Sequence, residues 1–175
     1  MRIKPLKQYL YHKTKEALID EITDLFSKFK IVQDYYQRKL GTSENGEILE
    51  KYKALVTREF FPARGYGKAR LSIAKNAVTD FRKISQSKTE WIEIMLHYVE
   101  MGVRFTNAYG DIDESFYTSM EGMYEQVLKF ILQAGIKQEF QQRCRRIVTD
   151  TDGIGWGFHD ALADMYQETF EQNQG

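Results

Sequence analysis

The stretch EWIEIMLHYVEMGVRFTNAY, residues 90–109, decides the fold. Its apolar residues recur at helical spacing along two stripes rather than one. The first stripe is Trp91, Ile94, Tyr98, Phe105 and Tyr109, and the second is Ile92, Met95, Leu96, Val99 and Val103. A helix that is apolar on two faces must be covered on two sides. The sequence therefore predicts a helix in the middle of a layered assembly.

The next stretch, residues 114–134, is also broadly apolar and predicts a second long helix. Asp111 or Asp113 can cap its start, and Gly135 ends it. Because the link of residues 110–112 is short, the two helices form an antiparallel hairpin.

Two glycines lie inside this predicted hairpin, where each costs about 1 kcal/mol relative to alanine. Gly102 and Gly122 are each ten residues from Ile112, so an antiparallel hairpin brings them to the same height. We expect close helix contact there, or room for an aromatic side chain from a third helix.

Apolar periodicity predicts seven further helices. Their ranges are 5–11, 14–29, 31–40 (a separate helix or a bent continuation), 44–60, 68–84, 137–149 and 158–170. Trp156 and Phe158, at the start of the last helix, are expected to plug one end of the core. The prediction is a single all-α domain over residues 1–175. Its architecture is one of stacked antiparallel helix hairpins, as a compact multi-helical bundle or a short HEAT-like α-solenoid of about nine helices.

Composition excludes several classes of protein. The 25 Lys and Arg residues balance 25 Asp and Glu residues, which argues against a generic polyanion binder. There is no apolar run long enough to span a membrane, and residues 1–15 are too polar for a signal peptide. The single cysteine, Cys144, excludes an internal disulfide and a multi-cysteine zinc site. We expect a cytoplasmic protein without membrane association.

Several separate stretches of the chain keep a recognisable order. They are EFFP at 59–62 with ARLSIAK at 69–75, YGDIDE at 109–114 and GWG at 155–157. In these stretches the chain resembles a family of uncharacterised bacterial proteins, a domain of unknown function. The resemblance extends over nearly the whole chain and implies a compact helical bacterial protein. It brings no activity, ligand or catalytic residue with it.

Charge is segregated along the chain. Residues 51–83 hold nine basic and two acidic residues, and residues 89–125 hold one basic and eight acidic. Residues 129–146 hold five basic and one acidic, and residues 149–175 hold six acidic and none basic. Neighbouring helices of opposite charge can neutralise one another, and we favour this interpretation. The alternative is that the first block forms a positive patch for an anionic partner.

The alternative depends on the segment RGYGKAR at 64–70. Arg64, Lys68 and Arg70 flank Gly65 and Gly67, which allow close backbone approach, and a helix is predicted to begin at residue 68. The N-terminus of a helix favours an anion such as phosphate, and Tyr66 can stack on a nucleobase. The segment is not a P-loop, because it lacks the lysine spacing and the preceding strand. A structural linker is the interpretation we favour.

Other candidate sites fail on residue count or spacing. Glu93, His97 and Glu100 share a helix face, but three histidines and no Glu-x-x-His motif cannot complete a di-metal site. The segment 150–153 begins like a calcium loop, but Ala161 occupies the position of the bidentate glutamate. No catalytic, cofactor or metal residue is therefore predicted.

The sequence is compatible with three hypotheses for function. The favoured one is a non-enzymatic cytosolic helical scaffold that binds a protein or peptide. The second is phosphate or nucleic-acid binding through the basic 62–70 loop and the following helix. The third, less favoured, is an enzyme of unrecognised type.

Overall fold

The computed structural model describes residues 3–41 and 46–171, which divide into two compact units, Met1–Glu44 and Asn45–Gly175. The described residues form nine helices and no strand, which confirms the predicted all-α fold. The expectation of a single domain over residues 1–175 stays a prediction, and the two units are described one at a time.

The first unit consists of α1 (Ile3–Tyr11), α2 (Lys15–Lys28) and α3 (Lys30–Leu40). Thr14 caps α2 as predicted, because its hydroxyl oxygen accepts a hydrogen bond from the N–H of Ala17 at 3.2 Å. Phe29 has extended backbone between α2 and α3. The segment after it is therefore a separate helix rather than a bent continuation.

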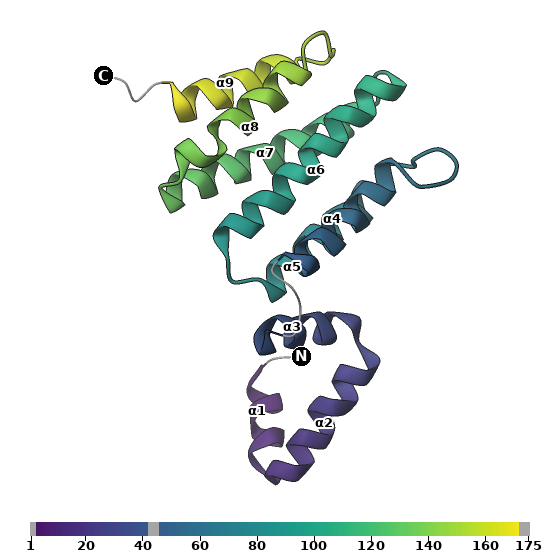
Figure 1. Cartoon of the computed structure of the whole chain (residues 1–175), viewed down its shortest axis with the longest axis vertical. Coiled ribbons are helices and arrows are strands. Elements are labelled where there is room, and N and C mark those ends of the chain that lie inside the picture. The colour runs from purple at the N-terminus through teal and green to yellow at the C-terminus, as the bar shows by residue number, and fades with distance from the viewer. Residues whose placement is uncertain (1–2, 42–45, 172–175) are drawn as a thin grey trace. The chain divides into compact units, whose positions relative to one another are not determined.

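The second unit is a stack of three helix hairpins. Its helices are α4 (Glu47–Phe60), α5 (Leu71–Ile84), α6 (Lys88–Tyr109), α7 (Glu114–Ala134), α8 (Lys137–Asp150) and α9 (Phe158–Phe170). Each hairpin pairs two consecutive helices, α4 with α5, α6 with α7, and α8 with α9. Helices α4 and α8 pack on α6 from its two sides, and α9 packs on α7 (Figure 1). This is the predicted arrangement of stacked hairpins, with α6 and α7 in the middle.

Helix α6 is buried along both of its apolar stripes, except at the ends. The second stripe is fully buried, and so are Ile94, Tyr98 and Phe105 of the first. Trp91 is half-buried and Tyr109 is 47% exposed. The prediction of two covered faces is therefore confirmed for the body of α6 and wrong for its last turn.

The α6–α7 hairpin is closed by the residues that the sequence indicated. Asp113 caps α7 by accepting a hydrogen bond from the N–H of Phe116 at 2.9 Å, and Gly135 ends α7 with φ +70°. A Cβ added at Gly102 would overlap the sulfur of Met120, so α6 and α7 approach closely there. Gly122 has open space beside it. Close contact therefore accounts for Gly102 but not for Gly122.

Two sequence predictions at the helix ends are wrong. The helix predicted over 68–84 begins at Leu71, because residues 66–70 are not helical. Phe158 is fully buried and does plug the core, but Trp156 is 61% exposed and has φ +63°. The predicted helix start at Glu44 lies outside the described residues, and α4 is described from Glu47.

Candidate functional site

A groove of about 370 Å³ lies between α4 and α6 on the surface of the second unit. Lys53, Thr57 and Arg58 of α4 line it, together with His97 of α6. Phe61, which directly follows α4, also lines it, and so does Glu50, which is paired with Lys53 at 2.9 Å. The groove is therefore lined mainly by polar side chains and by one aromatic ring.

Four charged residues connect α4, α6 and α8 beside the groove, and we call them the α4–α6–α8 charge network. Arg143 of α8 donates hydrogen bonds to Glu100 at 2.6 and 2.9 Å and to Glu93 at 2.6 Å. Lys53 of α4 also donates to Glu93, at 3.3 Å. Here the basic and acidic blocks of the sequence neutralise one another across three hairpins, as the favoured interpretation expected.

The network keeps its members charged. Burial opposes ionisation of Glu93, but the hydrogen bond and charge of Arg143, aided by Lys53, outweigh it and leave the pKa of Glu93 below its ordinary value. Burial likewise opposes the charge of Arg143, and its bonds to Glu100 and Glu93 outweigh it and raise the pKa of Arg143. Glu93 and Arg143 therefore stay ionised because each is stabilised by the charge of the other.

His97 is held neutral at the floor of the groove. Its Nε2 lies 2.8 Å from the hydroxyl oxygen of Thr57 and 3.2 Å from the backbone oxygen of Lys53. Because a carbonyl oxygen only accepts, Nε2 carries the ring proton. Burial, with the nearby charges of Lys53 and Arg143, lowers the pKa of His97 against the opposing pull of Glu100. The ring therefore serves to position α4 against α6.

A cluster of rings adjoins the groove at Phe61, and we call it the aromatic surface. Its members are Phe61, Tyr66 and Tyr109, with Arg104. Phe61 stacks on Tyr109 with ring centroids 6.2 Å apart, and Tyr66 meets Tyr109 edge-on at 6.2 Å. The guanidinium of Arg104 lies 5.1 Å from the centre of the Phe61 ring. Tyr66 is 84% exposed, so this surface is open to a partner.

The 62–70 loop divides the predicted anion-binding residues into two groups. Arg70 is bound to Glu59 through hydrogen bonds of 2.7 and 3.0 Å. Gly67 lies against α4, where an added Cβ would overlap the carbonyl oxygen of Phe60. Arg64, Gly65, Tyr66 and Lys68 are more open, and neither cation forms a salt bridge with another described residue. Gly67 and Arg70 therefore hold the second half of the loop against α4, and the first half of the loop is exposed.

The next two candidates are a metal site and a reactive cysteine, considered over residues 3–41 and 46–171. No group of three His, Cys, Asp or Glu residues there is placed to hold a metal ion. Glu93 and Glu100, which share a face with His97, are bound by Arg143 instead. Cys144 is fully buried, and its burial raises the pKa of the thiol to about 12.

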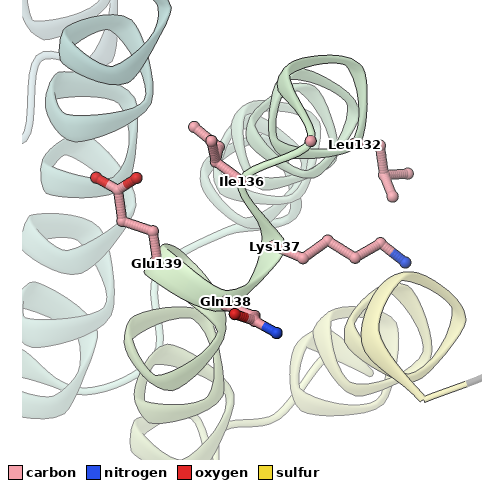
Figure 2. A pocket seen from close by; sticks show the side chains of 6 residues that line it. Leu132, Ile136, Lys137, Gln138 and Glu139 are labelled. Atoms are coloured by element: carbon pink, nitrogen blue, oxygen red, sulfur yellow. The ribbon is translucent and has the colours of Figure 1, made fainter.

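A second hollow, of about 560 Å³, lies at the turn between α7 and α8 (Figure 2). Figure 2 shows that the side chains of Lys137 and Glu139 point away from each other. Leu132 and Ile136 supply its apolar surface. Its ionisable groups do not converge, as a catalytic pocket would require.

The fold and this surface define an all-α protein of stacked hairpins with an open groove that adjoins exposed aromatic rings. Over residues 1–171 the chain matches the family of unknown function DUF6155, and it belongs to that family. Searches among curated proteins and among solved structures find no match. In the part of the chain that the structure describes, no helix is both long and apolar enough to cross a bilayer.

The sequence signal for this surface was incomplete. The sequence indicated Arg64, Tyr66 and Lys68, but it assigned Tyr109 to the core and gave no role to Phe61. The groove could not be seen, because it is formed by α4 and α6, which are far apart in sequence. An aromatic residue in the last turn of a helix, next to a glycine-containing connection, is the signal by which Tyr109 could have been recognised as a surface residue.

Proposed function

We propose that this chain is a non-enzymatic helical scaffold that binds an acidic, aromatic-containing segment of a protein partner. The segment would lie in the α4–α6 groove and end on the aromatic surface. The observation that supports this most directly is the position of Phe61, which both lines the groove and stacks on exposed Tyr109. A partner segment can therefore follow one continuous path.

The chemistry of the partner follows from which cations on this surface already have a carboxylate partner and which do not. Lys53 and Arg143 are neutralised by Glu93 and Glu100, so they offer little to a ligand. The exposed cations Arg58, Arg64 and Lys68 form no salt bridge within the described residues. Exposed Tyr and Arg side chains are the types that dominate binding energy at protein interfaces. A segment with carboxylates and aromatic rings fits both features.

We also propose that the protein acts in the bacterial cytoplasm. The proposal is supported by its single cysteine, which allows no internal disulfide, as is usual for proteins of a reducing compartment. The resemblance to bacterial proteins points the same way.

The experiment that tests binding uses a random displayed-peptide library with the full chain as bait. We expect enrichment of peptides that contain carboxylates and an aromatic residue. Synthetic copies should bind the Tyr66→Ala variant about ten-fold more weakly, since aromatic hot spots contribute about 1–2 kcal/mol. Lys129→Ala is the matched control, because Lys129 is exposed on α7 and away from the groove. Failure to enrich any peptide, or equal affinity for Tyr66→Ala, contradicts the proposal.

Binding of phosphate or nucleic acid is the second candidate, supported by exposed Arg64, Tyr66 and Lys68. Two observations weaken it. Arg70 is occupied by Glu59, and α5 begins at Leu71, after the loop rather than inside it. Titration with single-stranded RNA over a salt series decides between the two, since phosphate contacts give a steep loss of affinity with salt. Tight binding that Arg64→Ala abolishes would favour nucleic acid.

A further inference from the structure

Cations without a salt bridge lie on the first hairpin and carboxylates without one lie on the third, at the two opposite ends of the stack. The first hairpin exposes Arg58, Arg64 and Lys68. The third hairpin exposes acidic residues, namely Asp152, Asp160, Asp164 and Glu168. None of these seven forms a salt bridge with another described residue. Exposed Arg104 of α6 and exposed Arg145 and Arg146 of α8 also form no salt bridge with another described residue. The α6–α7 hairpin lies between the two sets, so they cannot pair within one molecule (Figure 1).

The acidic residues of α9 form one stripe. Asp160, Asp164 and Glu168 are four residues apart and therefore lie on the same face of the helix. Helix α9 is the last of the stack and packs on α7 and α8, through buried residues such as Leu162 and Tyr166. Like charges four residues apart repel by about 0.2–0.5 kcal/mol per pair, so a cationic partner on this face would relieve that repulsion.

An exposed tryptophan lies in the connection between α8 and α9, two residues before the start of α9. Trp156 is 61% exposed and has φ +63°, a backbone region that side chains other than glycine rarely adopt. The preceding Gly155 lies next to the Asp111 side chain in the α6–α7 connection. The connections of the three hairpins lie along one edge of the stack (Figure 1). Trp156 belongs to the connection between α8 and α9, and Tyr66 to the connection between α4 and α5.

From this complementarity we infer that the surface formed by Arg64, Lys68 and Tyr66 binds the acidic α9 stripe and Trp156 of a second copy of the chain. The inference rests on the proposed function, because this end of the molecule is itself an acidic, aromatic-containing segment. A chain with zero net charge can associate in this way without accumulating repulsion. Each copy carries both surfaces, so a two-fold dimer or a head-to-tail chain brings Arg64 and Lys68 of one copy against the acidic stripe of the next.

Reciprocal charge reversal tests the inference. One variant carries Arg64→Glu and Lys68→Glu, and the other carries Asp164→Lys and Glu168→Lys. Sedimentation velocity over a concentration series should show that the wild type associates and that each variant alone does so at least ten-fold more weakly. An equimolar mixture of the two variants should regain the association, because the reversed surfaces again have opposite charge. Lys129→Glu, a reversal on the middle hairpin, should leave association unchanged.

Two results would overturn the inference. One is a wild-type chain that stays monomeric up to about 100 µM, a concentration at which even weak specific interfaces form. The other is a mixture of the two variants that does not associate although circular dichroism shows both to be folded. In either case binding of the library peptides still reports on the proposed function separately. If those peptides bind a monomeric chain, the scaffold proposal stands and only the second copy is excluded as its partner.

Discussion

The second unit treats its charged residues in two different ways, in the α4–α6–α8 charge network and in the 62–70 loop. In the network, Arg143 and Lys53 reach carboxylates on α6 and help to hold three hairpins together. In the loop, Arg64 and Lys68 reach no carboxylate among the described residues. The residue types are the same, so composition does not separate stabilising charges from binding charges. What separates them is whether a neighbouring helix presents a partner.

The largest effect is expected where the loop is anchored, at Gly67. Replacement by alanine places a Cβ on the carbonyl oxygen of Phe60, which is backbone and cannot move aside. We expect Gly67→Ala to lower the free energy of unfolding by about 3 kcal/mol, measured by urea denaturation.

Gly65, two residues earlier, is the matched control for the loop. It has φ +75° but open space around it, so Gly65→Ala should cost only about 1 kcal/mol of backbone strain. Equal losses for the two variants would show that the loop is not anchored at Gly67.

The next largest difference is expected between Arg143, which belongs to the charge network, and Arg64, which lies in the loop. Arg143→Ala leaves the partly buried carboxylates of Glu93 and Glu100 without their main partner. We expect it to lower the free energy of unfolding by about 2 kcal/mol. Arg64→Ala should change it by less than about 0.5 kcal/mol, because an exposed cation without a partner contributes little. A loss on Arg64→Ala as large as that on Arg143→Ala would remove the distinction between the two regions.

A smaller effect is expected at two glycines of the α6–α7 hairpin, Gly102 in a packed position and Gly122 in an open one. Gly102 lies against the flexible side chain of Met120, so Gly102→Ala should lower the free energy of unfolding by about 1 kcal/mol. Gly122 has free space, so Gly122→Ala should raise it by about 0.5 kcal/mol through helix propensity alone. Thermal unfolding of the two variants should therefore shift the midpoint in opposite directions.

The sequence predicted the fold better than the surface, for a physical reason. The bounds of α7 and α9 agree with the predicted ranges to the residue. Asp113 and Gly135 mark the two ends of α7 locally, and Gly157 marks the start of α9. The start of α5 was three residues out, because the bond between Arg70 and Glu59 and the packing of Gly67 hold residues 66–70 in a non-helical form. Trp156 and Tyr109 were assigned to the core, since apolar periodicity alone does not show where a stack of helices ends. The same limit applies to the groove, which needs two distant helices.

The smallest effect concerns pH and separates His97 from the permanent charges of the network. Burial lowers the pKa of His97 in the folded chain below its ordinary value of about 6.5. At a pH between the lowered pKa of the folded chain and the ordinary pKa of the unfolded chain, the unfolded chain binds more protons than the folded chain. The free energy of unfolding therefore falls as the solution is acidified from neutral pH. In His97→Gln the amide nitrogen can still donate to the Lys53 carbonyl but does not titrate, so this part of the pH slope should disappear. Urea denaturation of both proteins between pH 7.5 and 5.5 measures the difference. If the two slopes are equal, His97 does not titrate with folding, and the neutral ring assigned to the floor of the groove is wrong.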